Sequence, residues 1–142
     1  MVLRAGDVVT MRKAYLAAAG VLVALATAVP AQADAPRRVT YVVTADSPVT
    51  ADIYYREAEP PTWADYSHNP YLYSPKAQVD VGPDRPWVRE VALTDPDRWA
   101  MVSATSGRLP AEPGFRCELR VDDVVVATGE GPKGALCSLR HW

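Results

Sequence analysis

The stretch FRCELRVDDVVVATGEGPKGALCSLR, residues 115–140, decides the fold of this chain. Apolar and charged residues alternate along its first part, and this period of two predicts a strand with one buried and one wet face. Asp122-Asp123 predicts a tight turn, because Asp tolerates left-handed backbone better than most residues. Three valines then start a second β-branched strand, which Gly129 and Gly131 are expected to end. Alternation returns in the last part, so the stretch predicts three short strands.

The N-terminal part of the sequence indicates export. Arg12 and Lys13 precede an apolar run over residues 14–29, and Ala-Gln-Ala at residues 31–33 has the small-x-small pattern of a cleavage site. The run is short for a membrane span, which needs about 20 apolar residues. We therefore predict a cleaved signal peptide over residues 1–33, with Met11 as an alternative start.

Cleavage leaves one domain over residues 34–142, or a slightly shorter one if it follows Ala35. We expect this domain to be secreted or to lie in the cell envelope, outside the cytoplasm. The alternative is an uncleaved N-terminal helix that anchors it. The formal net charge is −2 with no basic run, so nucleic acid and anionic lipid are poor partners.

The chain has two cysteines, Cys117 and Cys137, and both fall on apolar strand faces. Two cysteines in an exported chain indicate one disulfide bond. There are 19 residues between the two cysteines. In the chain-entropy model a bond that closes a loop of this size contributes about 3 kcal/mol to the free energy of unfolding. That is a large share of the net stability of a small domain.

Further strands are predicted upstream, where Trp87 and Trp99 fall within strand patterns and are expected in the core. The clearest alternation places Tyr55 on the buried face and Arg56 on the wet face. No helical period follows the N-terminal run. The sequence therefore predicts about seven short strands in an all-β sandwich or barrel. The upstream strands are expected over residues 39–45, 49–56, 78–81, 87–93 and 99–105.

Residues 57–76 differ in composition from the rest of the chain. Four prolines exclude a regular β-ladder, and a connection of this length is usually functional or disordered. Its aromatic side chains argue against disorder. They form either a flap over one end of the sandwich or a partner-binding surface, since Trp and Tyr supply contact area at low entropy cost. These residues are Trp63, Tyr66, Tyr71 and Tyr73.

Residues for catalysis are scarce. No Ser-His-Asp or Cys-His arrangement can be placed on matching strands, and the disulfide occupies both thiols. Asp65 and His68 lie three residues apart, which suits either an ordinary loop pair or a small metal or general-base site. We expect no enzyme, no metal and no cofactor; a small hydrolase or metal-binding protein is the lesser alternative.

Three segments resemble the extracytoplasmic domain of the mycobacterial MmpS proteins: VTYVVTADSPVTADIYY, the Pro86-Trp87 strand, and CELRVDDVVVATGEGPKGALC with its cysteine spacing. The resemblance implies an immunoglobulin-like β-sandwich. It also implies a non-enzymatic accessory role beside MmpL-type transporters, which export lipids and siderophores. The sequence departs from that family in its cleavage signal, in the long insert at residues 57–76, and in Asp123, where the family turn usually has Gly.

Two kinds of binding function follow as expectations. The first is contact with an MmpL-type transporter or an envelope lipid, through the sandwich faces and the aromatic insert. The second is a soluble carrier that holds an apolar ligand in a cavity between the sheets. The two differ in whether the core side chains leave a void.

Overall fold

The computed structural model describes residues 35–141, so the predicted signal peptide and its cleavage site lie outside the described residues. The described part holds eight strands and three short helical segments. No helix within residues 35–141 is long and apolar enough to cross a membrane. The strands are β1 (Arg37–Ala45), β2 (Val49–Tyr55), β3 (Lys76–Val81), β4 (Trp87–Leu93), β5 (Met101–Thr105), β6 (Phe115–Val121), β7 (Val124–Gly131) and β8 (Gly134–Ser138). The helical segments are α1 (Trp63–His68), η1 (Pro70–Leu72) and α2 (Pro96–Trp99).

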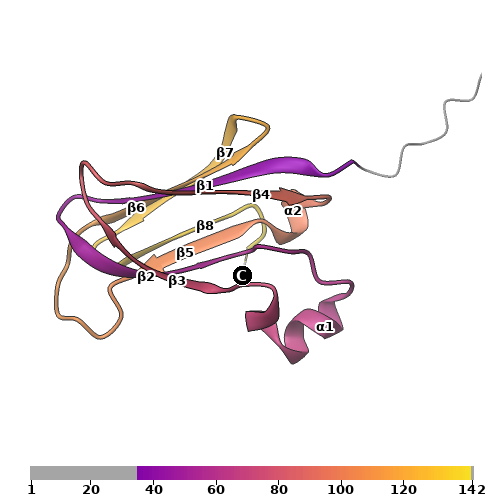
Figure 1. Ribbon diagram of the computed structural model, residues 1–142, viewed down its shortest axis with the longest axis horizontal. Helices are drawn as coiled ribbons and strands as arrows, with labels where there is room; N and C mark the ends of the chain where they lie inside the picture. The colour runs from indigo at the N-terminus through magenta and orange to yellow at the C-terminus, as the bar shows by residue number, and fades with distance from the viewer. Residues whose placement is uncertain (1–34, 142) are drawn as a thin grey trace, which may run out of the picture. The chain divides into compact units, whose positions relative to one another are not determined.

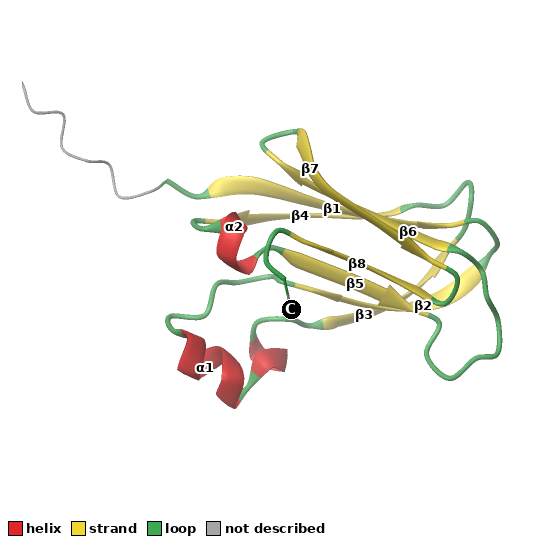
Figure 2. Cartoon of the chain, turned by 180° about the vertical axis from the view of Figure 1, so that it is seen from behind, coloured by secondary structure: helices red, strands yellow, loops and turns green. Residues whose placement is uncertain are grey.

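The strands form two four-stranded antiparallel sheets, ordered β4-β1-β6-β7 and β3-β2-β5-β8. Figure 1 and Figure 2 show the two sheets as layers that face each other. The prediction of an all-β sandwich is confirmed. The strand count is eight among the described residues instead of about seven.

The core lies between the sheets and comes mainly from β1, β2, β5 and β6, whose side chains alternate between buried and wetter positions. A buried polar group is also present: the Tyr41 hydroxyl donates a hydrogen bond of 2.8 Å to the carbonyl of Arg56. Burial raises the pKa of Tyr41 well above its usual value. The phenol is therefore a neutral donor at any physiological pH. Fully buried core members include Val39, Val43, Ile53, Val102, Phe115 and Leu119.

The predicted disulfide between Cys117 and Cys137 is confirmed, with a Cα–Cα distance of 6.1 Å. Cys117 lies on β6 and Cys137 on β8, so the two cysteines belong to different sheets. The bond joins the two layers through the core. The sequence predicted that both cysteines lie within one stretch of three consecutive strands. It did not predict that the two strands carrying them belong to different sheets.

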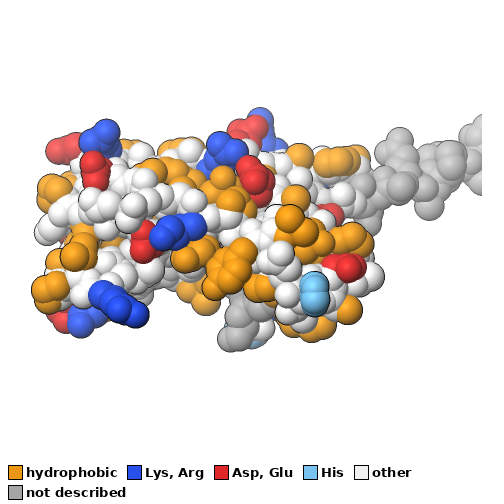
Figure 3. Space-filling view, turned by 60° about the horizontal axis from the view of Figure 1, so that its bottom comes forward, with side chains coloured by type: hydrophobic (Ala, Val, Ile, Leu, Met, Phe, Trp, Pro, Cys, Tyr) orange, Lys and Arg blue, Asp and Glu red, His pale blue; other side chains and the backbone are white. Residues whose placement is uncertain are grey.

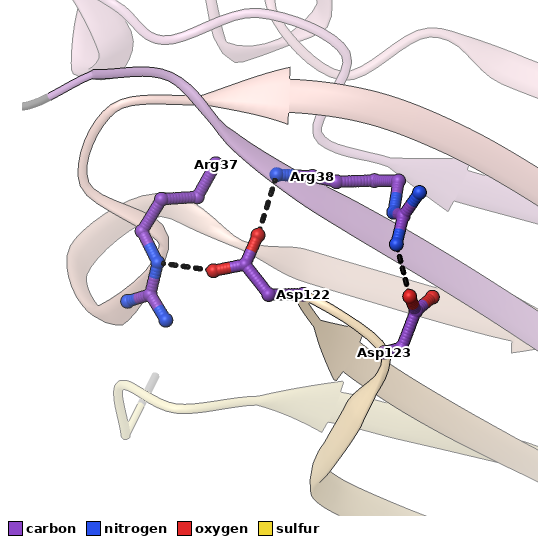
Figure 4. A network of polar contacts seen from close by, with 4 residues as sticks. All are labelled: Arg37, Arg38, Asp122 and Asp123. Carbon is purple, nitrogen blue, oxygen red and sulfur yellow. Dashed lines mark hydrogen bonds and ion pairs between the residues drawn. The ribbon is translucent and has the colours of Figure 1, made fainter.

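The turn between β6 and β7 follows the prediction. Asp122 and Asp123 have φ angles of 49° and 67°, the left-handed pair that a two-residue hairpin needs. Both carboxylates also bind the start of β1 (Figure 4). Asp122 accepts from Arg37 Nε at 2.9 Å and from the Arg38 backbone N–H at 3.2 Å, and Asp123 forms an ion pair with Arg38. The hydrogen bond from Arg37 lowers the pKa of Asp122.

Asp122→Asn tests this contact. Because the folded-state pKa of Asp122 lies below its unfolded value, the carboxylate stabilises the fold above the unfolded pKa, at about 4. This contribution is lost as pH falls through the folded-state value. We expect wild type to be slightly more stable than Asp122→Asn at neutral pH, with the difference vanishing in acid. Urea unfolding across pH measures this, and Asn keeps the left-handed turn. A difference independent of pH would show that charge is not the cause.

The second strand ends at Gly131 as expected, but it runs through Gly129, so the expectation that Gly129 also breaks it is wrong. Both glycines lie where the backbone of β8 comes close. A Cβ added at Gly129 would lie 2.4 Å from the Leu136 carbonyl oxygen, and one at Gly131 would lie 2.2 Å from that of Gly134. Glycine is required there for close approach of two strands.

The helical segments were not predicted. The first, α1, spans Trp63–His68 and is capped by Thr62, whose Oγ1 accepts from the Asp65 N–H at 3.1 Å. The segment α2 begins with Asp95 as its cap and Pro96 at its first position, and it ends at Trp99. Trp99 is buried as expected, but in a helix and not in a strand. Helices of six and four residues are too short to show a helical period in sequence.

Candidate binding surface at the helical end of the sandwich

Arg56 is the centre of the end that carries α1. It follows β2 directly and is fully buried, so its prediction as a wet-face residue is wrong. Its Nε donates to the carbonyl of Trp99 at 3.0 Å, and Nη1 donates to Ser74 Oγ at 2.7 Å. Its backbone N–H donates to the carbonyl of Met101 at 2.9 Å. The guanidinium therefore links the end of β2 to the segment before β3, which carries Ser74, and to the end of α2, which carries Trp99.

Aromatic rings cover this guanidinium. The Tyr66 ring centroid lies 4.2 Å from Arg56 Cζ, and that of Trp99 lies 5.6 Å from it. Trp63 stacks on Trp99 with centroids 6.0 Å apart, and Arg140 Cζ lies 4.2 Å from the Trp63 ring. Cation–π contacts strengthen when the cation is removed from water. The cluster holds α1 against the end of the sandwich.

Beyond this cluster the loop turns apolar side chains outward. Tyr71 and Leu72 are 70% and 68% exposed, and the Tyr71 ring lies 6.0 Å from that of Tyr54. Figure 3 shows this face, on which hydrophobic side chains gather. A hollow of about 350 Å³ opens beside Tyr71. Its lining, called the aromatic hollow below, is Tyr54, Tyr66, Pro70, Tyr71, Ser74 and Met101.

The four aromatic residues singled out in the sequence have different surroundings. Trp63 and Tyr66 contact each other, at 5.2 Å between centroids, and pack down on the cluster. Tyr71 points outward. Tyr73 is half-buried, and its carbonyl accepts from the Glu57 N–H at 3.0 Å. The insert is therefore a packed flap whose most exposed ring is Tyr71, while Trp63 stays 39% exposed.

Sequence reasoning missed four residues of the hollow: Tyr54, Pro70, Ser74 and Met101. In the sequence Tyr54 falls on the wet face of its predicted strand. A large aromatic ring at such a position could have indicated a binding surface. Ser74 and Met101 carry no such signal. They reach the hollow because backbone hydrogen bonds from Tyr55, Arg56 and Glu57 hold their two segments on either side of the end of β2, and Arg56 Nη1 adds a bond to Ser74 Oγ.

Asp65 and His68 lie on α1, and the Asp65 carboxylate accepts from Thr62 Oγ1 at 2.6 Å. This is a helix-capping contact. His68 is exposed in the last turn. No group of three or more His, Cys, Asp or Glu side chains that could hold a metal is found within residues 35–141.

A family model described as the Rv2576c beta-sandwich domain matches residues 41–137, which include both cysteines and the aromatic insert. The chain belongs to this family. It is 36% identical over 126 residues to the uncharacterized protein Rv2576c of Mycobacterium tuberculosis (strain ATCC 25618 / H37Rv), covering 89% of this chain and 79% of that protein. The uncharacterized protein Mb2606c of Mycobacterium bovis (strain ATCC BAA-935 / AF2122/97) matches with the same identity and coverage.

The membership in the Rv2576c family overturns the resemblance to MmpS proteins. The segments that carried that resemblance are alternating strands, a Val-rich hairpin and two spaced cysteines. Those features meet the general needs of a small disulfide-bonded sandwich. They therefore did not discriminate between families of this architecture.

Proposed function

We propose that this member of the Rv2576c family is a non-catalytic binding domain whose contact surface is the aromatic hollow. The observation that carries the proposal is the division within the insert. Trp63 and Tyr66 are held by packing and cation–π contacts, while Tyr71 and Leu72 remain exposed on the rigid support so formed. Exposed aromatic anchors on a pre-organised surface are typical of recognition sites.

The lining of the hollow supports an uncharged ligand. Its side chains are three phenols, a proline ring, a hydroxyl and a thioether, so none of them carries a charge at neutral pH. Arg56 lies beneath, covered by Tyr66. An apolar or proline-containing segment of a partner protein matches this chemistry, because aromatic rings pack against such segments and phenols donate to their carbonyls.

The placement outside the cytoplasm remains part of the proposal, and the disulfide bond supports it, because such bonds persist in oxidising compartments. The role beside an MmpL-type transporter rested on the MmpS resemblance and loses its support. The carrier alternative needs a void between the sheets. The buried side chains there form one contiguous cluster instead, which favours a surface site.

We also propose an immunoglobulin-like connectivity for the sandwich. In that fold, strands B and E are neighbours in one sheet and strands C and F in the other. Here β1 and β4 are neighbours in one sheet, and β2 and β5 in the other. This correspondence supports the assignment. The β6–β7 hairpin then lies beside β1, where the immunoglobulin fold has strand A.

Tyr71→Ala tests the binding proposal. We expect the change to weaken partner capture by more than about 1 kcal/mol, as loss of an anchor does, and to alter the free energy of unfolding by less than about 0.5 kcal/mol.

Trp63→Ala should instead lower the free energy of unfolding by about 2 kcal/mol, because it removes the stacking on Trp99 and the contact with Arg140.

The partner is captured by a photo-crosslinking amino acid, p-benzoylphenylalanine, at position 71 in mycobacterial cells. The same amino acid at position 109 is the control, because Leu109 is exposed on a loop outside the hollow. A discrete crosslinked product from position 71 alone supports the proposal. Equal products from both positions, or none from either, would place the contact surface elsewhere.

A further inference from the structure

The aromatic hollow is continuous with the outer face of the sheet β3-β2-β5-β8, since Tyr54 and Met101 of that sheet line the hollow. Tyr54 lies opposite Lys76 on β3 and opposite Ser103 on β5. Ser103 in turn lies opposite Leu136 on β8. Burial alternates along these strands, so all four side chains point away from the core. Below, these four residues are called the cross-strand row.

The chemistry of the cross-strand row changes from one end to the other. Lys76 places an exposed charge at one end, and Leu136 is 49% exposed at the other. Next to Lys76, the Tyr54 ring lies 6.0 Å from that of Tyr71, so two phenols form an apolar contact there. Ser103 separates this contact from Leu136 with a small side chain that carries a hydroxyl. A ligand along the row meets a cation, an apolar contact, a hydroxyl and a second apolar contact.

The spacing of the two apolar contacts fits a polyproline-II segment. Neighbouring strands are about 4.8 Å apart, so Tyr54 and Leu136, two strands apart, are separated by about 9.6 Å. In a polyproline-II helix every third residue returns to the same edge, after about 9.3 Å. An extended strand repeats its face after about 6.8 Å and fits poorly. An α-helix repeats after about 5.4 Å and would press a further side chain onto Ser103.

The middle of the row supplies what the backbone of such a segment needs. A polyproline-II helix has no internal hydrogen bonds, so its carbonyls require donors from water or from the protein. The hydroxyls of Tyr54 and Ser103 are donors on the row itself. Ser103 is also small enough for the backbone between two prolines to come close to the sheet. The row therefore offers two apolar contacts for proline rings and donors for the carbonyls between them.

The charge of Lys76 complements an acidic residue beside one of the prolines. Lys76 Nζ is 3.8 Å from the Asp52 carboxylate, and its side chain is 46% exposed. An exposed ion pair of this kind contributes little to stability, so the ammonium can bind a carboxylate of the ligand at low cost. Asp52 also accepts from Gln78 Nε2 at 3.2 Å, so it keeps that partner when Lys76 turns to the ligand.

We propose that the cross-strand row binds a polyproline-II segment of a partner protein, with two prolines three residues apart and an acidic residue next to one of them. One proline lies between Tyr54 and Tyr71, and the other lies on Leu136. The acidic residue pairs with Lys76, outside the uncharged hollow. This assignment rests on the proposed function, because it takes the hollow as the binding surface, and it adds the conformation, spacing and charge of the ligand.

NMR titration of isotope-labelled protein with three synthetic peptides tests the assignment. The probe is acetyl-EPAAPE amide, whose two acidic ends give either orientation a carboxylate near Lys76. We expect it to shift the amide resonances of Tyr54, Ser103 and Leu136. The peptide EPAAAPE should bind at least about fivefold more weakly, because its prolines no longer share an edge. The peptide KPAAPK should also bind at least about fivefold more weakly, because its lysines repel Lys76.

Two variants and their matched controls test the two ends of the row. Leu136→Ala should raise the Kd of EPAAPE by at least about fivefold. Val88→Ala should leave it unchanged, since Val88 is likewise exposed but lies on the other sheet. Lys76→Glu should weaken EPAAPE and strengthen KPAAPK. Lys133→Glu should change neither, although Lys133 is also exposed and pairs with Glu112 at 4.0 Å. Partial unfolding would weaken both peptides, so it cannot produce a reversed preference.

The outcomes separate this assignment from the proposed function. Preference for EPAAPE, its loss in Leu136→Ala and the reversal in Lys76→Glu would together support the assignment. Equal affinity for EPAAPE and EPAAAPE, or affinities that both variants leave unchanged, would overturn it. Absence of binding by all three peptides would also overturn it. The crosslink from position 71 depends on none of these peptides, so the proposed function stands or falls by that product alone.

Discussion

Arg56→Met is expected to lower the free energy of unfolding by about 2 to 4 kcal/mol. The change removes the donors to the Trp99 carbonyl and to Ser74 Oγ, and it leaves both acceptors buried without them. It also removes the cation under the Tyr66 ring. Release from burying a charge offsets part of the loss. Methionine preserves much of the side-chain volume, so little of the effect comes from a cavity.

The matched control is Arg89→Met. Arg89 also pairs with an acceptor, at 3.0 Å from Glu57, and lies over the Tyr55 ring, but it is exposed on β4. Exposed ion pairs contribute little, so we expect a change within about 1 kcal/mol. Urea unfolding followed by tryptophan fluorescence measures both variants. Equal effects would mean that burial of Arg56 does not stabilise the fold.

A double-mutant cycle separates the hydrogen bond to Ser74 from the other contacts of Arg56. If Nη1 stabilises the loop through Ser74 Oγ, Ser74→Ala should cost less in Arg56→Met than in wild type. The difference should be about 1 kcal/mol. Additive effects would show that the two side chains do not act together.

Loss of the disulfide is expected to lower the free energy of unfolding by about 3 kcal/mol. Cys117 and Cys137 are 20 residues apart in sequence and join β6 to β8 in the opposite sheet. Without the bond the unfolded chain gains loop entropy, and the two layers lose their covalent link. The double variant Cys117→Ala/Cys137→Ala avoids burying new hydroxyl groups.

The measurement compares wild type and the double variant with and without dithiothreitol. Reductant should shift the unfolding midpoint of wild type toward that of the variant and leave the variant unchanged. An equal midpoint for oxidised wild type and the double variant would show that the bond contributes no stability. If reduction lowered both midpoints, the effect of reductant would come from something other than this bond.

The sequence by itself determined the features that depend on neighbouring residues. Alternation along β1, β2 and β6 predicted strands, since a period of two follows from strand geometry alone. Asp122-Asp123 predicted the left-handed turn because those side chains tolerate positive φ. The disulfide followed from there being two cysteines in a chain that indicates export. Alternation and spaced cysteines are common to many sandwiches, so they did not identify the family.

Only the tertiary structure decided which segments meet across the sandwich. Arg56 continues the wet face of β2 in sequence, but Tyr66 of α1 and Trp99 of α2 cover it. Its donors then bond to the carbonyl of Trp99 and the hydroxyl of Ser74. Gly129 is predicted to break the strand, but β7 runs through it, and the close approach of the β8 backbone explains why glycine stands there. The same folding stacks Trp63 on Trp99, where it is 39% exposed, and leaves Tyr71 70% exposed. A side chain's burial depends on contacts between residues distant in sequence, and local pattern contains no information about them.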